Sequence, residues 1–389
     1  MKSRHLIFIS LICSIHLFGL HHNFGPSFYF ILDALGFSLI FADLISKKRK
    51  YHNKDPFKFL FIGLFVAIGL SAVSCFFYHD QDIISTTIAM RYFIYLLIYF
   101  QLQKVHLTID WIEKGIIIGA ILYMSAFTLQ YILFPFKILD YGSITEMERG
   151  LLRFRIEGAG FLMLATFLAL NRFIEKRSIK FLIFYTIGMV FLFMLGFRTL
   201  LVAGIISSFY LIIKLSKKPS LIVRNTIISI ALSSPLLLVD EVNSYITEMT
   251  EISEKQINSG DDYIRKRTFK FYMEKVNIDE ISLLFGNGFP QENSKYGKIT
   301  HSGSKLYGYI FADLGIVGFA IIYGLIATLF FLLILIKAIR IKTDREYYYL
   351  SAYFLYIFIA CFTTAELYRA GIFGIQALGL FLISRTKIS

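Results

Sequence analysis

Long apolar runs constrain the fold of this chain more than any other feature of its sequence. The runs are roughly 17–22 residues long, and a helix of that length crosses the ~30 Å hydrocarbon core of a bilayer. Of the 389 residues, 56% are hydrophobic and 17% are charged, whereas a soluble chain of this size carries more charge. An outer-membrane barrel would instead show alternating segments of about 10 residues. We therefore predict an all-α, polytopic integral membrane protein.

The apolar runs predict about twelve membrane-spanning helices. The first run has a basic start but no clear small-residue cleavage site, so we predict a retained helix and not a signal peptide. Only Phe197 and Arg198 separate the seventh and eighth runs, which could also form one kinked element. The predicted spans are residues 6–20, 28–45, 59–78, 84–102, 115–134, 158–173, 181–196, 199–214, 222–239, 315–336, 347–365 and 370–384.

Basic residues predict the orientation of these spans, because Lys and Arg collect in short cytoplasmic loops. The run Lys47-Lys48-Arg49-Lys50 places the loop after the second span inside, and alternation then places both termini in the cytoplasm. These loops hold most of the 40 basic residues, which explains the net charge of +13 without nucleic acid binding. We predict a single membrane domain over residues 1–389, in which two long loops, 135–157 and 240–314, lie on the outer side of the membrane. The larger is polar enough to fold as a small cap.

Two arginines depart from this charge pattern. Arg91 lies about eight residues into the fourth span, ~12 Å below its outer end. An ionised residue there faces a bundle interior or a wet cavity, so it either forms a structural ion pair, with Asp33 as partner, or binds an anion. Arg198 lies in a tight outer turn at the start of a helix. It is either a snorkelling anchor or a phosphate-binding group beside a helix N-terminus.

Further arginines lie in the two outer loops. The run Arg265-Lys266-Arg267 either forms a solvated helix face or clamps a diphosphate in bidentate fashion. Arg149, Arg153 and Arg155 in the smaller loop raise the same question. Arg149 and Arg153 would share one face if that segment were helical.

His301 is a candidate for acid–base chemistry, since neutral imidazole is the natural general base near pH 7. It is the only histidine in the large loop. The upstream Gly286-Asn287-Gly288 and the following Gly303 predict that the backbone here can come close to a ligand.

Other chemistry has less support. The sequence has no P-loop, no dinucleotide fingerprint and no nucleophile elbow. Asp80-Gln81-Asp82 has the spacing of a metal pair used with nucleotide sugars, but we expect it outside, where those donors are not available. We interpret His16, His21 and His22 as interface residues, and Cys13, Cys75 and Cys361 as small buried hydrophobes. We predict no metal and no cofactor.

Four stretches resemble the bacterial inner-membrane superfamily of O-antigen polymerases (Wzy type) and O-antigen ligases. Phe197-Arg198-Thr199 is similar to the family's Ser-Arg turn, and Arg155 to Gly158 to its arginine-glycine entry. Arg265, followed by Phe269 and Gly286-Asn287-Gly288, resembles the large-loop arginine and Gly-x-Gly. His301 to Gly318 resembles the His-Asn and acidic-Gly re-entry helix, with Ser302 in place of the family's Asn.

The resemblance implies a metal-independent glycosyltransferase whose bundle binds a lipid-linked donor. The donor would be an oligosaccharide on undecaprenyl diphosphate at the periplasmic face of the bacterial inner membrane, and a chain-length regulator protein a possible partner. Catalytic roles would fall to Arg198 and Arg265 at the diphosphate and to His301 at the acceptor. His301 would activate the acceptor hydroxyl or only position it. Support at the diphosphate would come from Arg91, Arg153, Arg155 and Arg267. Aromatic rings of Tyr263, Tyr272, Tyr296 and Tyr307 could stack on sugars.

Two alternatives remain open at this point. A ligase would transfer the glycan to lipid A–core instead of to a second lipid-linked repeat unit. A lipid-linked oligosaccharide flippase or other transporter also has about twelve spans, but commonly shows internal repeats and broken helices. The sequence shows no repeat, and Pro235 is the one proline inside a predicted span.

Overall fold

The computed structural model describes most of the chain as helix, as the sequence predicts. The described residues are 3–20, 25–46, 55–105, 107–136, 156–216, 263–365 and 371–387, with short pieces at 138–139, 147–148, 151–152, 154, 218–220, 223–224, 226–227, 247, 251, 254 and 368. Within them, the strands are β1 (Met147–Glu148) and β2 (Leu151–Leu152), which pair antiparallel over two residues each. The remaining regular structure is helical.

The helices follow the predicted spans closely. A helix lies in every predicted range except 222–239, which falls almost wholly outside the described residues. The seventh and eighth spans are separate helices. The α-helices and 3₁₀ helices (η) are α1 Ser3–Ser14, α2 His16–Gly19, α4 Pro26–Ser46, α5 Lys58–His79, α6 Ile83–Ala89, η1 Arg91–Leu97, α7 Ile98–Gln103, α8 Ile109–Ile132, α9 Ala159–Lys176, α10 Ile179–Met194, α11 Arg198–Leu215, α14 Ile264–Lys275, α15 Glu280–Phe285, α16 Lys295–Tyr307, η4 Phe311–Leu314, α17 Ile316–Arg340, η5 Arg345–Tyr347, α18 Tyr348–Ala360 and α19 Phe373–Thr386.

Five of the described helices are long and apolar enough to cross a membrane: α4, α5, α8, α11 and α17. A sixth span arises if α6 and the following η1–α7 segment, which meet at a bend of 59°, count as one. Large apolar side chains on these helices face outward, with Phe59, Phe77 and Ile132 all more than two-thirds exposed. A contiguous apolar exterior of this kind fits a lipid environment, because water would disfavour it.

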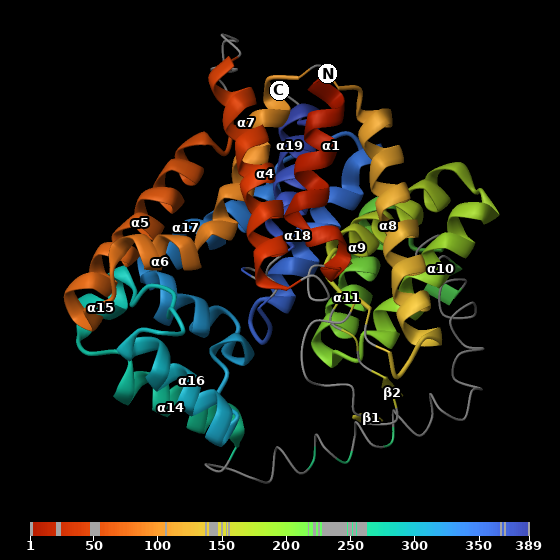
Figure 1. Cartoon of the computed structure of the whole chain (residues 1–389). Helices are drawn as coiled ribbons and strands as arrows, with labels where there is room; N and C mark the ends of the chain where they lie inside the picture. Colours follow the sequence, from red (N-terminus) through yellow and green to blue (C-terminus); the bar gives the residue numbers. More distant parts are fainter. Residues whose placement is uncertain are drawn as a thin grey trace.

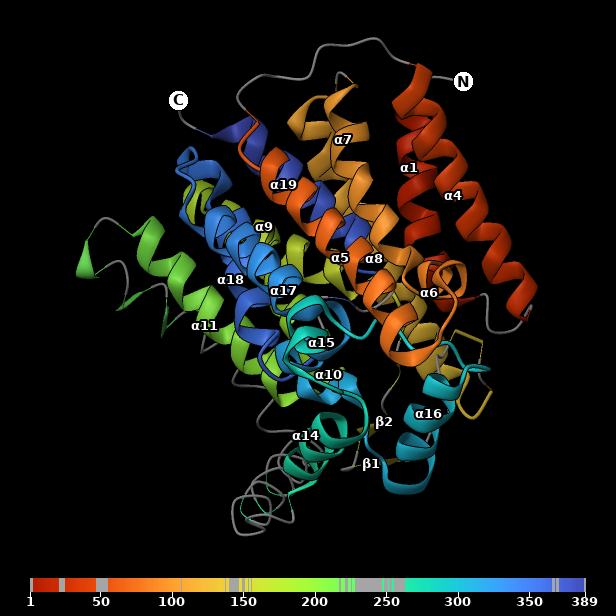
Figure 2. The ribbon, with the colours of Figure 1, turned by 90° about the vertical axis from the view of Figure 1, so that its left-hand side faces the viewer.

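The molecule has two distinct ends. Figure 1 shows the N- and C-termini together at one end, and α14, α15 and α16 at the opposite end. Figure 2, turned by 90°, shows the same separation, with α15 nearer to the bundle than α14 and α16. We refer to residues 263–314 as the cap. Near the centre of the bundle, α9 is buried along most of its length and packs against α8, α10, α11 and α18.

Besides a left-handed turn at residues 16–18, two breaks interrupt helices of the described bundle, and the sequence analysis did not predict them. One is the bend between α6 and η1. The other is in α17, where Gly324 adopts φ +89° and ψ 160° inside the helix. The backbone carbonyls of Ile321 and Ile322 lose their helical partners at such a break. They accept hydrogen bonds from the N–H groups of Asn287 (3.1 Å) and Gly288 (2.8 Å) in the cap.

The cap glycines therefore serve a different purpose from the predicted one. Gly286 has φ +92°, and a Cβ atom built on it would lie 2.5 Å from the backbone nitrogen of Gly324. The close approach is to the backbone of α17 and not to a ligand. This contact anchors the cap to the bundle.

We expect Gly286→Ala to destabilise the protein far more than Gly308→Ala. Both glycines have positive φ, so both substitutions strain the backbone by about 1–2 kcal/mol. Only Gly286 also meets backbone atoms, whereas a Cβ on Gly308 has open space around it. Thermal unfolding of the two variants in detergent measures the difference. Equal melting temperatures would show that the Gly286–Gly324 contact does not hold the cap.

Candidate functional site

A buried ionic network surrounds Asp33 of α4, whose side chain is 2% exposed. Arg91 donates from Nε to Asp33 Oδ2 at 2.6 Å, and the Tyr95 hydroxyl donates to Asp33 Oδ1 at 2.8 Å. His16 Nε2 lies 3.0 Å from the same Oδ1 atom. On the other side of the imidazole ring, His16 Nδ1 lies 2.6 Å from Glu157 Oε2. We call these five residues the Asp33 cluster.

The Asp33 cluster balances its charges. Both ring nitrogens of His16 face carboxylate oxygens, which suits a doubly protonated, cationic imidazole. His16 and Arg91 then offset Asp33 and Glu157, as buried charges require. His16 was predicted to be an interface residue, but it is fully buried. It begins a left-handed turn of three non-glycine residues, His16 to Phe18, that aims its ring inward.

Arg91 forms the ion pair with Asp33 that the sequence analysis held as one of two possibilities. Its terminal nitrogens also donate to the Ile88 carbonyl at 2.9 Å and to the Tyr92 hydroxyl at 2.8 Å. Aromatic rings of Tyr29, Phe30 and Tyr92 lie within 5 Å of its guanidinium carbon. Within the described part of the chain, these contacts use one N–H of each terminal nitrogen, and diphosphate binding by Arg91 stays a prediction.

Arg198 is the first residue of α11 and is half-buried. No side chain forms a hydrogen bond at the cap position of this helix, which Arg198 directly follows. The neighbouring Thr199 receives a hydrogen bond of 2.8 Å from Thr363, just after α18. The Cys361 carbonyl there accepts from the Ile316 N–H at 2.7 Å. The starts of α11 and α17 therefore meet at the end of α18, where the cap rejoins the bundle.

The cap presents cations at the start of α14. Arg265, Lys266 and Arg267 occupy its first turn, which has no acidic residue and no side-chain cap. Cations at a helix N-terminus oppose the helix dipole and destabilise the helix, so the arrangement favours a bound anion. Arg265 is half-buried, and no residue in the described part of the chain pairs with it.

His301 lies on the exposed face of α16, within a stripe of lysines. Lys295, Lys298 and Lys305 are all exposed, and their spacing of three to four residues places them on the same side as His301. We call these four residues the α16 stripe. The opposite face of α16 packs on α14, where a Cβ on Gly303 would lie 2.6 Å from the Phe271 ring. The stripe and the basic turn of α14 thus belong to adjacent helices.

Two of the four tyrosines predicted to stack on sugars are unavailable. Tyr272 and Tyr296 are each 1% exposed and form a small apolar cluster with Cys75, Val276, Leu314 and Ile321. Burial raises the pKa of Tyr272 to about 12, which removes it from proton transfer near neutral pH. Tyr307 is 60% exposed and remains a candidate, as does the half-buried Tyr263.

The Asp80-Gln81-Asp82 segment has structural contacts. Gln81 is buried and binds Thr86 and the Phe289 carbonyl through its amide nitrogen. Its oxygen accepts from the Gln291 N–H and the Ser294 hydroxyl. Asp82 caps α6 by accepting from the Ser85 N–H. In the part of the chain described, no group of three or more His, Cys, Asp or Glu side chains is placed to hold a metal ion.

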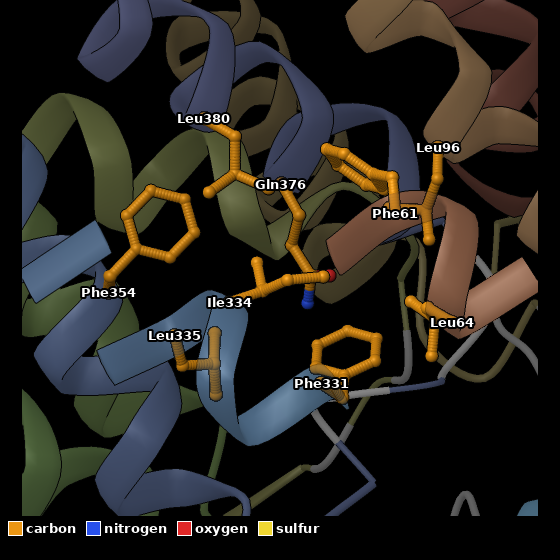
Figure 3. Close-up of a pocket in the computed structure, with 9 residues that line it drawn as sticks. All are labelled: Phe61, Leu64, Leu96, Phe331, Ile334, Leu335, Phe354, Gln376 and Leu380. Atoms are coloured by element: carbon orange, nitrogen blue, oxygen red, sulfur yellow. The ribbon is translucent and has the colours of Figure 1, made fainter. Parts of the chain in front are cut away.

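An apolar pocket lies inside the bundle, away from the cap. Figure 3 shows its lining side chains converging from α5, η1, α17, α18 and α19: Phe61, Leu64, Leu96, Phe331, Ile334, Leu335, Phe354, Gln376 and Leu380. The space between them is too narrow for a water molecule. It is a packing gap of the core and offers no site for a glycan.

The remaining predicted arginines are only partly placed. Arg153 and Arg155 lie outside the described residues, although Phe154 and Ile156 beside them are buried. Arg267 is exposed and has an interaction within the protein. The sequence analysis missed His16 and Glu157 as partners in the Asp33 cluster. The position of Glu157 directly before Gly158 and of His16 at a span end was the available signal.

We expect Asp33→Ala to lower stability by about 3–5 kcal/mol, because it leaves the cations of His16 and Arg91 buried without their carboxylate. Asp82→Ala is the matched control, since it removes an exposed carboxylate that caps a helix and should cost about 1 kcal/mol. Thermal unfolding in detergent ranks the two variants. The cluster would be energetically unimportant if both melted at the same temperature.

No model of a known protein family matches the sequence, and no curated protein is significantly similar to it.

Proposed function

We propose that this chain is a polysaccharide polymerase, which transfers a glycan from undecaprenyl diphosphate to an incoming lipid-linked repeat unit. The reaction takes place at the periplasmic face of a bacterial inner membrane. In this proposal the bundle has about twelve spans with both termini in the cytoplasm, and the cap is periplasmic. The observation that carries the proposal is the half-buried Arg265, which has no partner among the described residues and lies in a basic helix turn at the end of the bundle opposite both termini.

The chemistry of the donor explains why a cation there matters. Breaking the bond between the sugar and the diphosphate transfers negative charge to the leaving group. A guanidinium next to unsatisfied helix N–H groups stabilises that charge with directed, charge-assisted hydrogen bonds. We assign Arg265 and Arg198 to the diphosphate, because both lie in the first turn of a helix without a side-chain cap. Arg91, Arg153, Arg155 and Arg267 support it.

The acceptor side of the reaction is assigned to the α16 stripe. His301 orients the acceptor hydroxyl, and the flanking lysines attract the diphosphate of the acceptor lipid. The exposed ring of Tyr307 follows on the same helix and offers an aromatic face for sugars. A chain-length regulator would be the partner that limits successive transfers.

A transporter is the second candidate, because α17 contains a break. Broken helices in transporters offer free backbone carbonyls to ions. In α17, the carbonyls of Ile321 and Ile322 are already occupied by Asn287 and Gly288. The break thus seats the cap, which favours the enzyme over the carrier. A ligase would use the same donor chemistry with a different acceptor.

Deletion of the gene tests the assignment and separates polymerase from ligase. Loss of a polymerase leaves lipopolysaccharide with core plus a single repeat unit, because ligation still proceeds. Loss of a ligase leaves bare core and accumulates lipid-linked polymer. Gel electrophoresis of lipopolysaccharide from the deletion strain shows which pattern arises. A normal polymer ladder would refute both assignments. Lipid-linked repeat units that stay on the cytoplasmic face of the inner membrane would indicate a transporter.

We expect Arg265→Ala to reduce polymer by a factor of about 100 or more in the complemented deletion strain, since the variant loses a charge-assisted contact to the leaving group. Arg265→Lys should also be poor, because a lysine cannot make bidentate contacts. Lys270→Ala is the matched control on the same helix, where Lys270 is exposed and pairs with Glu274. Equal ladders from Arg265→Ala and Lys270→Ala, at equal protein level in the membrane, would remove Arg265 from the site.

A further inference from the structure

His79 occupies the junction between the bundle and the cap. It is the last residue of α5 and is half-buried. Its ring stacks on that of Tyr296 in α16, with centroids 4.1 Å apart and planes 12° from parallel. Tyr296 is itself held by a hydrogen bond from its hydroxyl to the Gly288 carbonyl. Stacking on the buried, hydrogen-bonded ring of Tyr296 therefore sets the plane of the imidazole.

The contacts of Asn287 determine which nitrogen of His79 carries the proton. The Asn287 amide nitrogen donates to the Ile321 carbonyl at 2.9 Å, which only accepts. The Asn287 oxygen must then be the atom that faces His79 Nε2, at 2.9 Å. An amide oxygen also only accepts, so Nε2 carries hydrogen. In the neutral ring the lone pair is consequently on Nδ1.

The Nδ1 atom of His79 is available to a ligand. No residue in the described part of the chain forms a hydrogen bond with it, and it is not among the enclosed polar atoms that lack a partner. Titratable groups beside His79 include Asp80, the next residue along the chain, and the stacked Tyr296. An oriented imidazole with an open basic nitrogen is the arrangement that general-base catalysis requires.

His301 lacks this orientation. It is exposed on α16, and no described residue forms a hydrogen bond with its ring. A general base works best when a third group holds its ring in position. Asn287 does this for His79, whereas no described residue does it for His301.

We propose that His79 is the general base of the glycan transfer and that Asn287 is its positioning residue. This inference rests on the proposed function. The acceptor is a sugar hydroxyl, whose oxygen forms a bond to the anomeric carbon of the donor. The bond from that carbon to the diphosphate oxygen breaks, and the lipid diphosphate leaves with the bonding electron pair. The hydroxyl proton passes to Nδ1 of His79 and then to water.

The test uses His79→Gln in the full chain, purified and reconstituted in nanodiscs with undecaprenyl-diphosphate repeat units. The glutamine amide can still donate to Asn287, but it offers no basic nitrogen. We expect the transfer rate to fall by a factor of about 100 or more, with KM for the donor unchanged. The wild-type rate should fall in acid solution as the imidazole protonates, and the residual rate of His79→Gln should lose this acid limb.

Two controls make the outcomes distinguishable. Lys270→Ala should retain the wild-type rate and pH profile, and thermal unfolding shows whether His79→Gln is folded. If the wild type is active, a fully active His79→Gln would overturn the assignment of His79 as the base. An acid limb that persists in His79→Gln and disappears in His301→Gln would also overturn it. Neither result would refute the proposed function. A wild-type protein that transfers no glycan from a lipid diphosphate would overturn the proposed function, and this inference with it.

Discussion

The need to satisfy buried polar groups within an apolar bundle governs this structure, and Asp33 is its clearest case. Neither water nor lipid can compensate a carboxylate that is 2% exposed, so protein groups must surround it. Arg91 and Tyr95 of η1 and His16 of α2 surround the Asp33 carboxylate. Through His16, Asp33 is also linked to Glu157 at the entry to α9. One acidic side chain thereby joins segments that share no local sequence pattern.

The same requirement operates at both ends of the bundle. Arg172 of α9 pairs with Glu113 at 2.6 Å and Glu346 at 3.2 Å, and Tyr349 donates to Glu113. Near the cap, the carbonyls that lack helical partners at the break in α17 accept hydrogen bonds from Asn287 and Gly288. A helix can break in an apolar medium only where other protein groups replace its lost hydrogen bonds. The break and the cap thus depend on each other.

Because most buried charges in the bundle are paired, the cations without a described partner are candidates for binding an anionic ligand. Most buried charges of the bundle have partners, whereas Arg265 and the lysines of the α16 stripe have none among the described residues. They lie on two adjacent helices of the cap. Positive charge gathered beside an apolar surface suits an amphiphile with an anionic head and a hydrocarbon tail. A lipid-linked diphosphate has both parts.

The apolar runs and their basic flanks determined the helices, because hydrophobic length and charge placement are local properties. They also indicated Asp33 as a possible partner of Arg91, because ionised residues inside spans are rare and usually pair. Local pattern could not reveal contacts such as His16 with Glu157, 141 residues apart, or His79 with Asn287, 208 residues apart. It likewise did not reveal that Gly286 packs against the backbone of α17. Such pairs arise only when packing brings distant segments together, so the tertiary structure decided that His79 is oriented and that Arg265 has no partner among the described residues.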